Sequence, residues 1–389
     1  MRMTVLIGIF TGLFLVSASS LWAGPPTGAP EGWVATPKLH IKGQGPFKNI
    51  RPDYITGYGY YPSQIKAVYG ISGNGAGQTI AIVDAYGSPT ITYDLGYFCN
   101  ALKLPQADLR IYYPGGLPAS SDSGWAEETS LDVEWVHALA PKATIALVIA
   151  PTDSGDDLFD AVKYAAQTLH AQVVSMGWSG DEFSDEADYD SYLQNTGTVF
   201  IAASGDSGSG GQYPAASPNV VAAGGTALYL QPGTGTLKFP EVAWEGSGGG
   251  VSQYEPMPAY QASFGLTGGM RCVPDVAFLA DPNTGVWVYD SVNGWYVVGG
   301  TSLSAQSWAA IVALADQLRA AAKLAPLTDG HQALYTLAGS SARYNVKGYY
   351  RDITAGYNGD FAALAGYDFI TGLGCPMAGS LVPALKLVK

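Results

Sequence analysis

The stretch Trp295-Tyr-Val-Val-Gly-Gly-Thr-Ser-Leu-Ser-Ala-Gln-Ser-Trp-Ala-Ala-Ile-Val312 joins a strand-like run to a helix through a glycine turn. The aromatic and β-branched run from Trp295 to Val298 favours a strand. Apolar residues then recur at helical spacing from Ser302 to Leu318, which predicts a long helix with a buried face. Ser302 stands where that helix begins. It either caps the helix or projects its hydroxyl into a cleft, where free backbone N–H groups of the first turn can stabilise an oxyanion.

Outward from this stretch, short apolar runs alternate with helical patterns along most of the chain. Asp156 to Leu169 carries a second helical stripe, and the Gly-rich portion from Gly210 to Gly300 favours loops and hairpins near a cleft. The alternation predicts an α/β fold with a parallel, buried sheet. Further strands are expected at Thr79 to Val83, Ala143 to Ile149, Gln172 to Met176, Val199 to Ala203, Val220 to Ala223 and Val286 to Tyr289.

The net charge of the chain limits the classes of molecule that it can bind. The 389 residues include 19 Lys or Arg and 32 Asp or Glu, a net charge of −13, and only 13% are charged. Nucleic acid is excluded because phosphate binding needs clustered cations that this sequence lacks. The folded chain is expected to tolerate an acidic medium, because falling pH neutralises carboxylates and lowers their mutual repulsion. With 47% hydrophobic residues, we expect one large domain, acting as a monomer.

The N-terminal residues have the layout of an export signal. Residues 1–23 begin with Arg2, run apolar from Val5 to Val16 and end in small residues. The apolar run is shorter than the ~20 residues that span a bilayer. We therefore expect a secreted or periplasmic protein with no stable membrane association after signal removal. Residues 24–60 are rich in Gly and Pro and predict an irregular extension, and residues 61–389 hold the main domain. The three cysteines allow at most one disulfide.

Two acidic motifs are candidates for chemistry. Glu128 and Asp132 are four residues apart in a helical pattern, which places both carboxyl groups on one helix face. Ser204-Gly-Asp206 follows the apolar strand that ends at Ala203, and ligands bind at the carboxyl ends of such strands. Taken singly, the first motif is most often a solvated helix face and the second an ordinary turn.

A third motif lies near the C-terminus. Asp352-Ile-Thr354 and Gly366-Tyr-Asp368 place two carboxylates in Gly-rich irregular backbone whose carbonyls are free to point inward. Calcium prefers six or more such oxygen ligands, although the spacing is not that of an EF-hand.

Taken together and in this order, the motifs resemble those of the sedolisin family, serine-carboxyl peptidases with a subtilisin-like fold. The resemblance covers about Tyr61 to the C-terminus. It implies a mostly parallel central sheet flanked by helices on both faces, and endopeptidase action on polypeptide substrates. The matching strings are Glu128-x-x-x-Asp132, Ser204-Gly-Asp206, Gly300-Thr-Ser302, Asp352-Ile353 and Gly366-Tyr-Asp368-x-x-Thr-Gly-x-Gly374.

The resemblance also implies a role for each matching residue. Ser302 is the expected nucleophile, Glu128 its general base, Asp132 the group that orients Glu128, and Asp206 part of the oxyanion hole. Asp84 and Trp178 resemble the outer network behind Asp132. One calcium ion is expected, held by the side chains of Asp352 and Asp368 and the carbonyls of Ile353, Leu364 and Gly366.

A catalytic site built from a serine and three carboxyl groups is expected to work at acid pH. A carboxylate with a pKa near 4.3 can accept the serine proton where an imidazole is already charged, and Asp206 must be protonated to donate to an oxyanion. We expect Glu128 and Asp132 to share a proton and titrate as a pair. The carboxyl pKa values predict greatest activity at roughly pH 3 to 5.

Two departures from the family pattern support an alternative reading. Gln306 replaces the usual proline four residues after the nucleophile, for which we expect a modest effect on rigidity. Only about forty residues precede the catalytic region after the expected signal, which argues against control by a large pro-domain. The alternative is an exported, non-catalytic binding or scaffold protein. A His-dependent subtilisin-like site is disfavoured because His40, His137, His170 and His331 lack the Gly-rich setting it requires.

Overall fold

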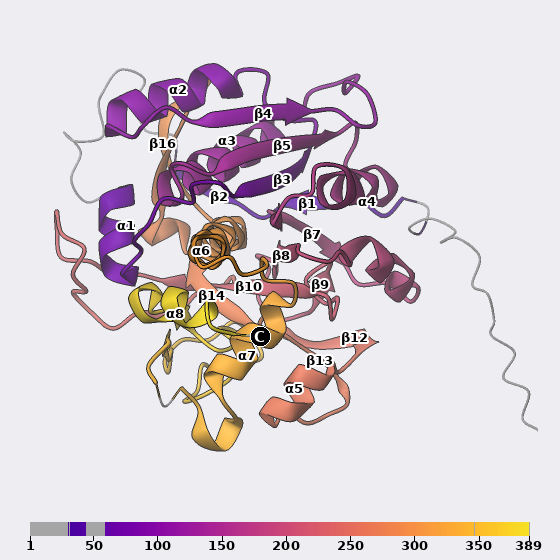
Figure 1. Cartoon of the computed structure of the whole chain (residues 1–389), viewed down its shortest axis with the longest axis vertical. Helices are drawn as coiled ribbons and strands as arrows, with labels where there is room; N and C mark the ends of the chain where they lie inside the picture. The colour runs from indigo at the N-terminus through magenta and orange to yellow at the C-terminus, as the bar shows by residue number, and fades with distance from the viewer. Residues whose placement is uncertain (1–29, 31, 44–58, 346, 389) are drawn as a thin grey trace, which may run out of the picture.

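A largely parallel sheet forms the centre of the molecule (Figure 1). The computed structural model describes residues 30, 32–43, 59–345 and 347–388. The strand order is β11-β10-β8-β6-β3-β5-β4, with β14 also paired to β10, and only β11 runs antiparallel to its neighbour. The bounds are β3 (Thr79–Ala85), β4 (Asp108–Tyr112), β5 (Thr144–Ala150), β6 (Val173–Met176), β8 (Val199–Ala203), β10 (Val220–Ala227), β11 (Val242–Ala243) and β14 (Val276–Leu279).

Helices cover both faces of this sheet. On β3, Ile80 and Ile82 join the core that contains α3 (Ser123–Leu139) and α6 (Thr301–Ala321). Ala81 and Val83 point to the opposite core, which α4 (Gly155–Lys163) covers. Because both faces are buried, the strands are apolar throughout rather than alternating. The α/β class expected from the sequence is confirmed. The predicted helix from Asp156 to Leu169 is α4 continued by a π-helical turn, η2 (Tyr164–Thr168).

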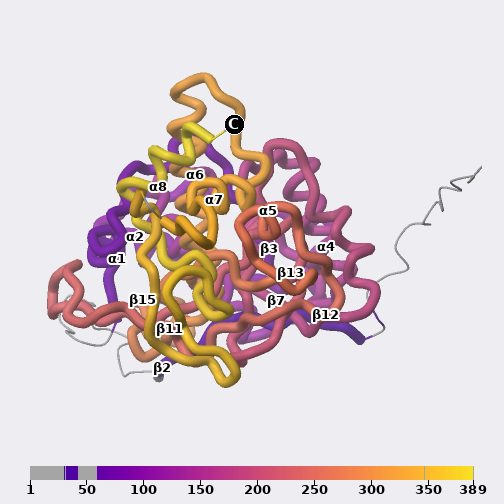
Figure 2. The backbone as a smooth tube through the Cα atoms, turned by 90° about the horizontal axis from the view of Figure 1, so that it is seen from below, coloured from indigo at the N-terminus to yellow at the C-terminus, as the bar shows by residue number. Residues whose placement is uncertain are grey.

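Smaller elements surround the central layers, and Figure 2 shows the C-terminal helices α7 and α8 gathered beside α6. The small sheets contain β7 (Trp178–Asp181), β9 (Gln212–Tyr213), β12 (Gly250–Pro256), β13 (Met270–Val273), β15 (Val286–Asp290), β16 (Gly294–Gly299), β17 (Tyr350–Arg351) and β18 (Cys375–Pro376). The other helices are α1 (Pro62–Tyr69), α2 (Ile91–Leu102), η3 (Glu186–Leu193), α5 (Ala259–Phe264), η4 (Pro282–Thr284), α7 (Gly330–Ala338), η5 (Ser341–Arg343) and α8 (Ala378–Leu385).

The N-terminal segment is built into two of the small sheets. β1 (Thr36–Pro37) pairs antiparallel with β7, and β2 (His40–Gly43) pairs antiparallel with β16. The sequence predicts an irregular extension here because neither run is long enough to stand out as a strand. Both strands depend on partners far away in the chain. The segment crosses the middle of the molecule near the start of α6 (Figure 1).

The predicted signal peptide, residues 1–23, lies outside the described residues. Within the described ranges, no helix combines the length and apolar character needed to cross a bilayer. Cys99, Cys272 and Cys375 are all buried with free thiols, within the limit of one disulfide set by the sequence.

Candidate active site

The two carboxyl groups of α3 face the start of β7. Glu128 and Asp132 are fully buried and lie one turn apart on one face of α3. Gly177 lies directly before β7, and a Cβ atom there would lie 2.2 Å from Glu128 Oε1 and 2.6 Å from Asp132 Oδ2. Only a residue without a side chain fits against both carboxyl groups. Trp178, the neighbour of this glycine, was expected near the site from the sequence, whereas no sequence pattern pointed to Gly177.

Ser302 lies opposite the same glycine, in the first turn of α6. Its Oγ is 2.7 Å from the carbonyl oxygen of Gly177 and 2.5 Å from that of Lys38. The two carbonyls compete for one hydroxyl hydrogen. Glu128 accepts no hydrogen bond of good geometry from the described residues, yet the nearness of the hydroxyl opposes the rise in the pKa of this carboxyl group. Ser302, Glu128 and Asp132 therefore converge around Gly177.

Burial dominates the electrostatics of the carboxyl pair. It raises the pKa of Glu128 well above its usual range, and the charge of Asp84 adds to that rise. Burial likewise raises the pKa of Asp132, together with the charges of Glu128 and Asp84. Desolvation disfavours the ionised form of each group. The pair therefore holds protons at pH values where exposed carboxyl groups are ionised.

Asp84 and Trp178 lie behind this pair. Asp84 is on β3, fully buried, and burial raises its pKa to about 7. The indole Nε1 of Trp178 donates to the carbonyl of Val83 at 2.7 Å. Trp178 therefore fixes the end of the strand that carries Asp84.

Asp206 borders the other side of Ser302, after β8. Its Oδ1 accepts hydrogen bonds from the backbone N–H of Thr301 at 2.8 Å and from the Thr301 hydroxyl at 2.7 Å. Its Oδ2 lies 3.4 Å from Nε2 of His40. Burial raises the pKa of Asp206 to about 6, although the bonds from Thr301 and the charges of His40 and Lys38 lower it.

The N-terminal segment lies across Ser302 as an extended peptide. The carbonyl oxygen of Lys38 accepts from the backbone N–H of Ser302 at 3.1 Å, and the Lys38 N–H donates to the carbonyl of Gly177 at 3.0 Å. The segment packs directly against Gly300, where only a glycine leaves room for it. A Cβ there would lie 2.0 Å from the Lys38 carbonyl oxygen and 2.7 Å from Leu39 Cα. Sequence patterns gave no signal for this contact, which joins residues 264 positions apart.

Gln306 has a different role from the one its position suggested. The sequence predicts only a small change in rigidity from the missing proline, but the fully buried Gln306 side chain reaches the carboxyl pair. Its Nε2 lies 2.5 Å from Asp132 Oδ2 and donates to it. This bond opposes the rise in the pKa of Asp132.

None of the four histidines, all of which lie in the described ranges, hydrogen-bonds Ser302. The Nε2 of His137 bonds the carbonyl of Pro105 at 2.8 Å, and His331 packs against Tyr260. Only His40 reaches the site, and it contacts Asp206. The rejection of an imidazole base therefore agrees with the geometry.

The five expected calcium ligands lie in one C-terminal loop region. Asp352 accepts from the N–H of Gly366 at 3.1 Å, and Asp368 accepts from the N–H of Leu364 at 3.1 Å. Among the described residues, no hydrogen bond uses the carbonyl oxygens of Ile353, Leu364 or Gly366. In the described part of the chain, no group of three or more His, Cys, Asp or Glu side chains is arranged so that it could hold a metal ion, but this loop offers only two carboxylates. Its oxygen-only donors fit calcium.

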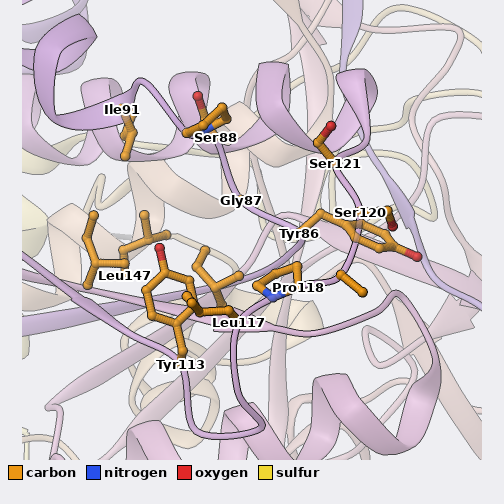
Figure 3. Close-up of a pocket in the computed structure, with 14 residues that line it drawn as sticks. Tyr86, Gly87, Ser88, Ile91, Tyr113, Leu117, Pro118, Ser120, Ser121 and Leu147 are labelled. Atoms are coloured by element: carbon orange, nitrogen blue, oxygen red, sulfur yellow. The ribbon is translucent and has the colours of Figure 1, made fainter.

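A cavity of about 470 Å³ opens at the carboxyl ends of β3 and β5. Figure 3 shows Tyr113, Leu117 and Leu147 gathered on one side of it. The cavity shares no lining residue with the surroundings of Ser302. It is linked to the N-terminal segment through Asp153, whose side chain accepts from the Tyr86 hydroxyl at 3.0 Å and whose carbonyl accepts from the Ala35 N–H.

Several known proteins are similar to this chain in sequence. Residues 122–347 match the model of the Subtilase family. Kumamolisin from Bacillus sp. (strain MN-32) is 33% identical, over 90% of this chain and 68% of its own length. Sedolisin from Pseudomonas sp. (strain 101) is 30% identical over 64% of this chain, and tripeptidyl-peptidase 1 from Canis lupus familiaris is 29% identical over 56%. The chain spans only 49% and 43% of the lengths of these two proteins.

Solved structures show the same fold. Pseudomonas sedolisin, a serine-carboxyl proteinase complexed with pseudo-iodotyrostatin, superposes with a TM-score of 0.69 at 24% identity, covering 85% of this chain and 98% of that one. Sphericase gives a TM-score of 0.51 at 18% identity, covering 80% and 96%. The expected subtilisin-like fold is thereby confirmed. By its sequence relatives and its fold, the chain belongs to the sedolisin family of serine-carboxyl peptidases.

Proposed function

We propose that the protein is an acid-acting serine-carboxyl endopeptidase that hydrolyses peptide bonds in polypeptides. Ser302 is the nucleophile, Glu128 the general base and Asp132 the group that orients Glu128. Asp206, when protonated, donates to the oxyanion. One contact supports the proposal most directly. The carbonyl oxygen of Lys38 accepts hydrogen bonds from both the backbone N–H and the hydroxyl of Ser302, as the carbonyl of a bound substrate would.

The surroundings of Ser302 support this chemistry. As Oγ attacks a peptide carbonyl, its proton passes to Glu128, which later returns it to the leaving amine. The backbone N–H of Ser302 can stabilise the negative charge that develops on the carbonyl oxygen of the substrate. This N–H already donates a hydrogen bond to the Lys38 carbonyl oxygen. A protonated Asp206 on the other side adds a second donor. A covalent acyl-enzyme on Ser302 then reacts with water by the same proton transfers.

The course of the bound segment favours endopeptidase action. The segment pairs with β7 before Lys38 and with β16 after it. A peptide in the same position therefore continues on both sides of Ser302. The edges of β7 and β16 offer backbone hydrogen bonds that a peptide of any sequence can use.

Acid dependence follows from opposite requirements on the carboxyl groups. Glu128 needs to be ionised, so activity rises once the buried pair loses a proton. Asp206 needs to be protonated, and its pKa of about 6 sets the upper edge of the active range. A substrate that takes the place of the segment is expected to bring water to the pair and so to lower its pKa values. Activity therefore belongs on the acid side of neutrality.

Calcium and export complete the proposal. The two carboxylates and three carbonyls of the C-terminal loop would hold one calcium ion, which when bound neutralises the carboxylates and ties the loop together. The signal-like composition of residues 1–23 supports a secreted or periplasmic location.

Digestion of denatured casein or haemoglobin at pH 4, with calcium present, tests the proposed function. The wild-type chain is expected to produce peptides, and Ser302→Ala none. Absence of cleavage by a folded wild-type chain at every acid pH would favour a non-catalytic scaffold with this fold.

A further inference from the structure

An aromatic pocket lies between α4 and the end of β7 (Figure 1), and the proposed reaction does not use it. Its walls are Phe159 of α4 and Phe183, which follows β7, and its floor is Gly180. We propose that this pocket is a substrate subsite, which binds an aromatic side chain, preferably tryptophan, in the sixth position before the bond that is cut. The inference rests on the proposed peptidase function.

Trp33 of the N-terminal segment fills the aromatic pocket and shows what it holds. The indole ring lies 6.2 Å from the Phe159 ring, stacked at 25°, and 5.6 Å from the Phe183 ring at 59°. A Cβ atom on Gly180 would lie 2.7 Å from Trp33 Cζ2, so only a glycine leaves room for the indole there. The indole Nε1 donates to the carbonyl of Asp181 at 2.8 Å. The pocket therefore offers both ring contacts and a partner for the polar edge of an indole.

Other side chains hold the walls of the pocket in place. Phe159 is fully buried, and its ring lies 5.8 Å from that of Trp178 and 5.7 Å from that of Tyr213. The Phe183 ring lies 5.8 Å from that of Tyr213, and the Phe183 N–H donates to the carboxyl group of Glu186 at 2.8 Å. The walls are therefore supported independently of Trp33. A ligand gains the contacts without having to order the pocket first.

Backbone hydrogen bonds determine which residue of a bound peptide reaches the pocket. Lys38 presents its carbonyl oxygen to Ser302. Before it, Thr36 pairs with β7, and the N–H of Ala35 donates to the carbonyl of Asp153 at 3.0 Å. These bonds use only backbone atoms of the segment, so a substrate of any sequence that takes its place can adopt the same register. A slip by one residue would turn the side chains to the opposite face.

The position of the pocket in this register follows by counting back from the carbonyl at Ser302. Trp33 is five residues before Lys38, which is the sixth position before the Lys38–Leu39 bond. Five residues of extended chain, at about 3.3 Å each, span about 16 Å. A contact so far from the reacting bond is the same in the bound substrate and in the transition state, so it lowers KM and leaves kcat unchanged. The preferred substrates are therefore polypeptides with at least six residues before the bond.

Paired peptides test the subsite with the full chain at pH 4. A peptide that the chain cuts at a single bond, identified by mass spectrometry, is prepared with tryptophan, phenylalanine or alanine in the sixth position before that bond. The tryptophan peptide is expected to have a KM about tenfold lower than the alanine peptide, a change of about 1.4 kcal/mol, at equal kcat. The phenylalanine peptide can stack but cannot donate to the Asp181 carbonyl, so its KM should lie between the two.

Two variants assign this preference to the pocket. Phe183→Leu keeps an apolar side chain and removes a ring that contacts Trp33, so the preference for tryptophan should fall at least threefold while kcat/KM for the alanine peptide stays unchanged. Tyr192→Leu is the matched control, because the Tyr192 ring contacts those of Phe159 and Tyr189 on the far side of the same aromatic group. The control should keep the wild-type preference. An equal loss in both variants would overturn the role given to the pocket.

The outcomes separate this inference from the proposed function. Cleavage of the tryptophan and alanine peptides with equal kcat/KM would overturn the inference alone. Failure to cleave casein or any of the peptides, by a chain shown to be folded by circular dichroism, would overturn both.

Discussion

Replacing Gln306 by methionine tests how the carboxyl pair holds its proton. The substitution keeps the length of the side chain and removes the donor that lies 2.5 Å from Asp132 Oδ2. The second oxygen of this carboxyl group, Asp132 Oδ1, has no hydrogen-bond partner among the described residues. The ionised form of Asp132 therefore loses a large part of its stabilisation when this donor is lost.

The magnitude follows from the energy of one hydrogen bond to a charged group. Such a bond contributes about 1.5 to 3 kcal/mol, and one pKa unit corresponds to about 1.4 kcal/mol. The pKa of Asp132 is therefore expected to rise by about one to two units. Because Asp132 and Glu128 titrate as a pair, the acid limb of the kcat/KM profile should move to higher pH by about one unit.

The assay is kcat/KM for a peptide substrate at pH values from 3 to 8. Ser307→Ala is the matched control, because Ser307 is buried on the same helix and its hydroxyl has no partner among the described residues. The control should keep the wild-type profile. An acid limb for Gln306→Met that coincides with wild type would refute the role given to this hydrogen bond, and a shift shared with Ser307→Ala would assign the effect to packing of the helix.

Gly177→Ala should slow casein cleavage more than about tenfold, a change of about 1.4 kcal/mol, because its Cβ would lie 2.2 Å from Glu128 Oε1; a smaller loss would contradict this. Chelation of calcium should lower Tm in wild type and have little effect in Asp368→Asn, as differential scanning fluorimetry can measure; equal responses would argue against a site there. Burial raises the pKa values of Asp84 and Asp316 to about 7, so their stabilising contribution is complete below about pH 4 and is lost as pH rises through 7. Tm should accordingly fall from pH 4 to pH 8, and a rise would contradict the burial argument.

The central sheet and the main helices could be predicted from the sequence because their signals are local. The apolar runs of β3 and β8 and the helical stripe of α6 each reflect neighbours in the chain. The same holds for Glu128 and Asp132, whose spacing alone places them on one face of a helix. The Ser302 position followed from the glycine turn before it.

The contacts that complete the site could not be predicted from local patterns. Lys38 meets Ser302 across 264 residues of chain, and the two short strands beside it form only because β7 and β16 offer open edges. Gln306 carries an ordinary helix-forming side chain, so its bond to Asp132 depends on how α6 packs against α3. Gly177 is needed because it has no side chain, which leaves room for the carboxyl groups of Glu128 and Asp132. In each case tertiary packing, and not propensity, determines the role.

The pH profile of Asp206→Asn, measured beside wild type, is the strongest test of whether a protonated Asp206 is required for catalysis. Asparagine keeps an acceptor for the Thr301 N–H and carries an amide donor at every pH, whereas the wild-type carboxyl group donates only when protonated. Wild-type kcat/KM is expected to decline above about pH 6, following the pKa of Asp206, and this decline is expected to move to higher pH in Asp206→Asn. A wild-type profile that stays flat to pH 8, or an unchanged decline in the variant, would contradict it.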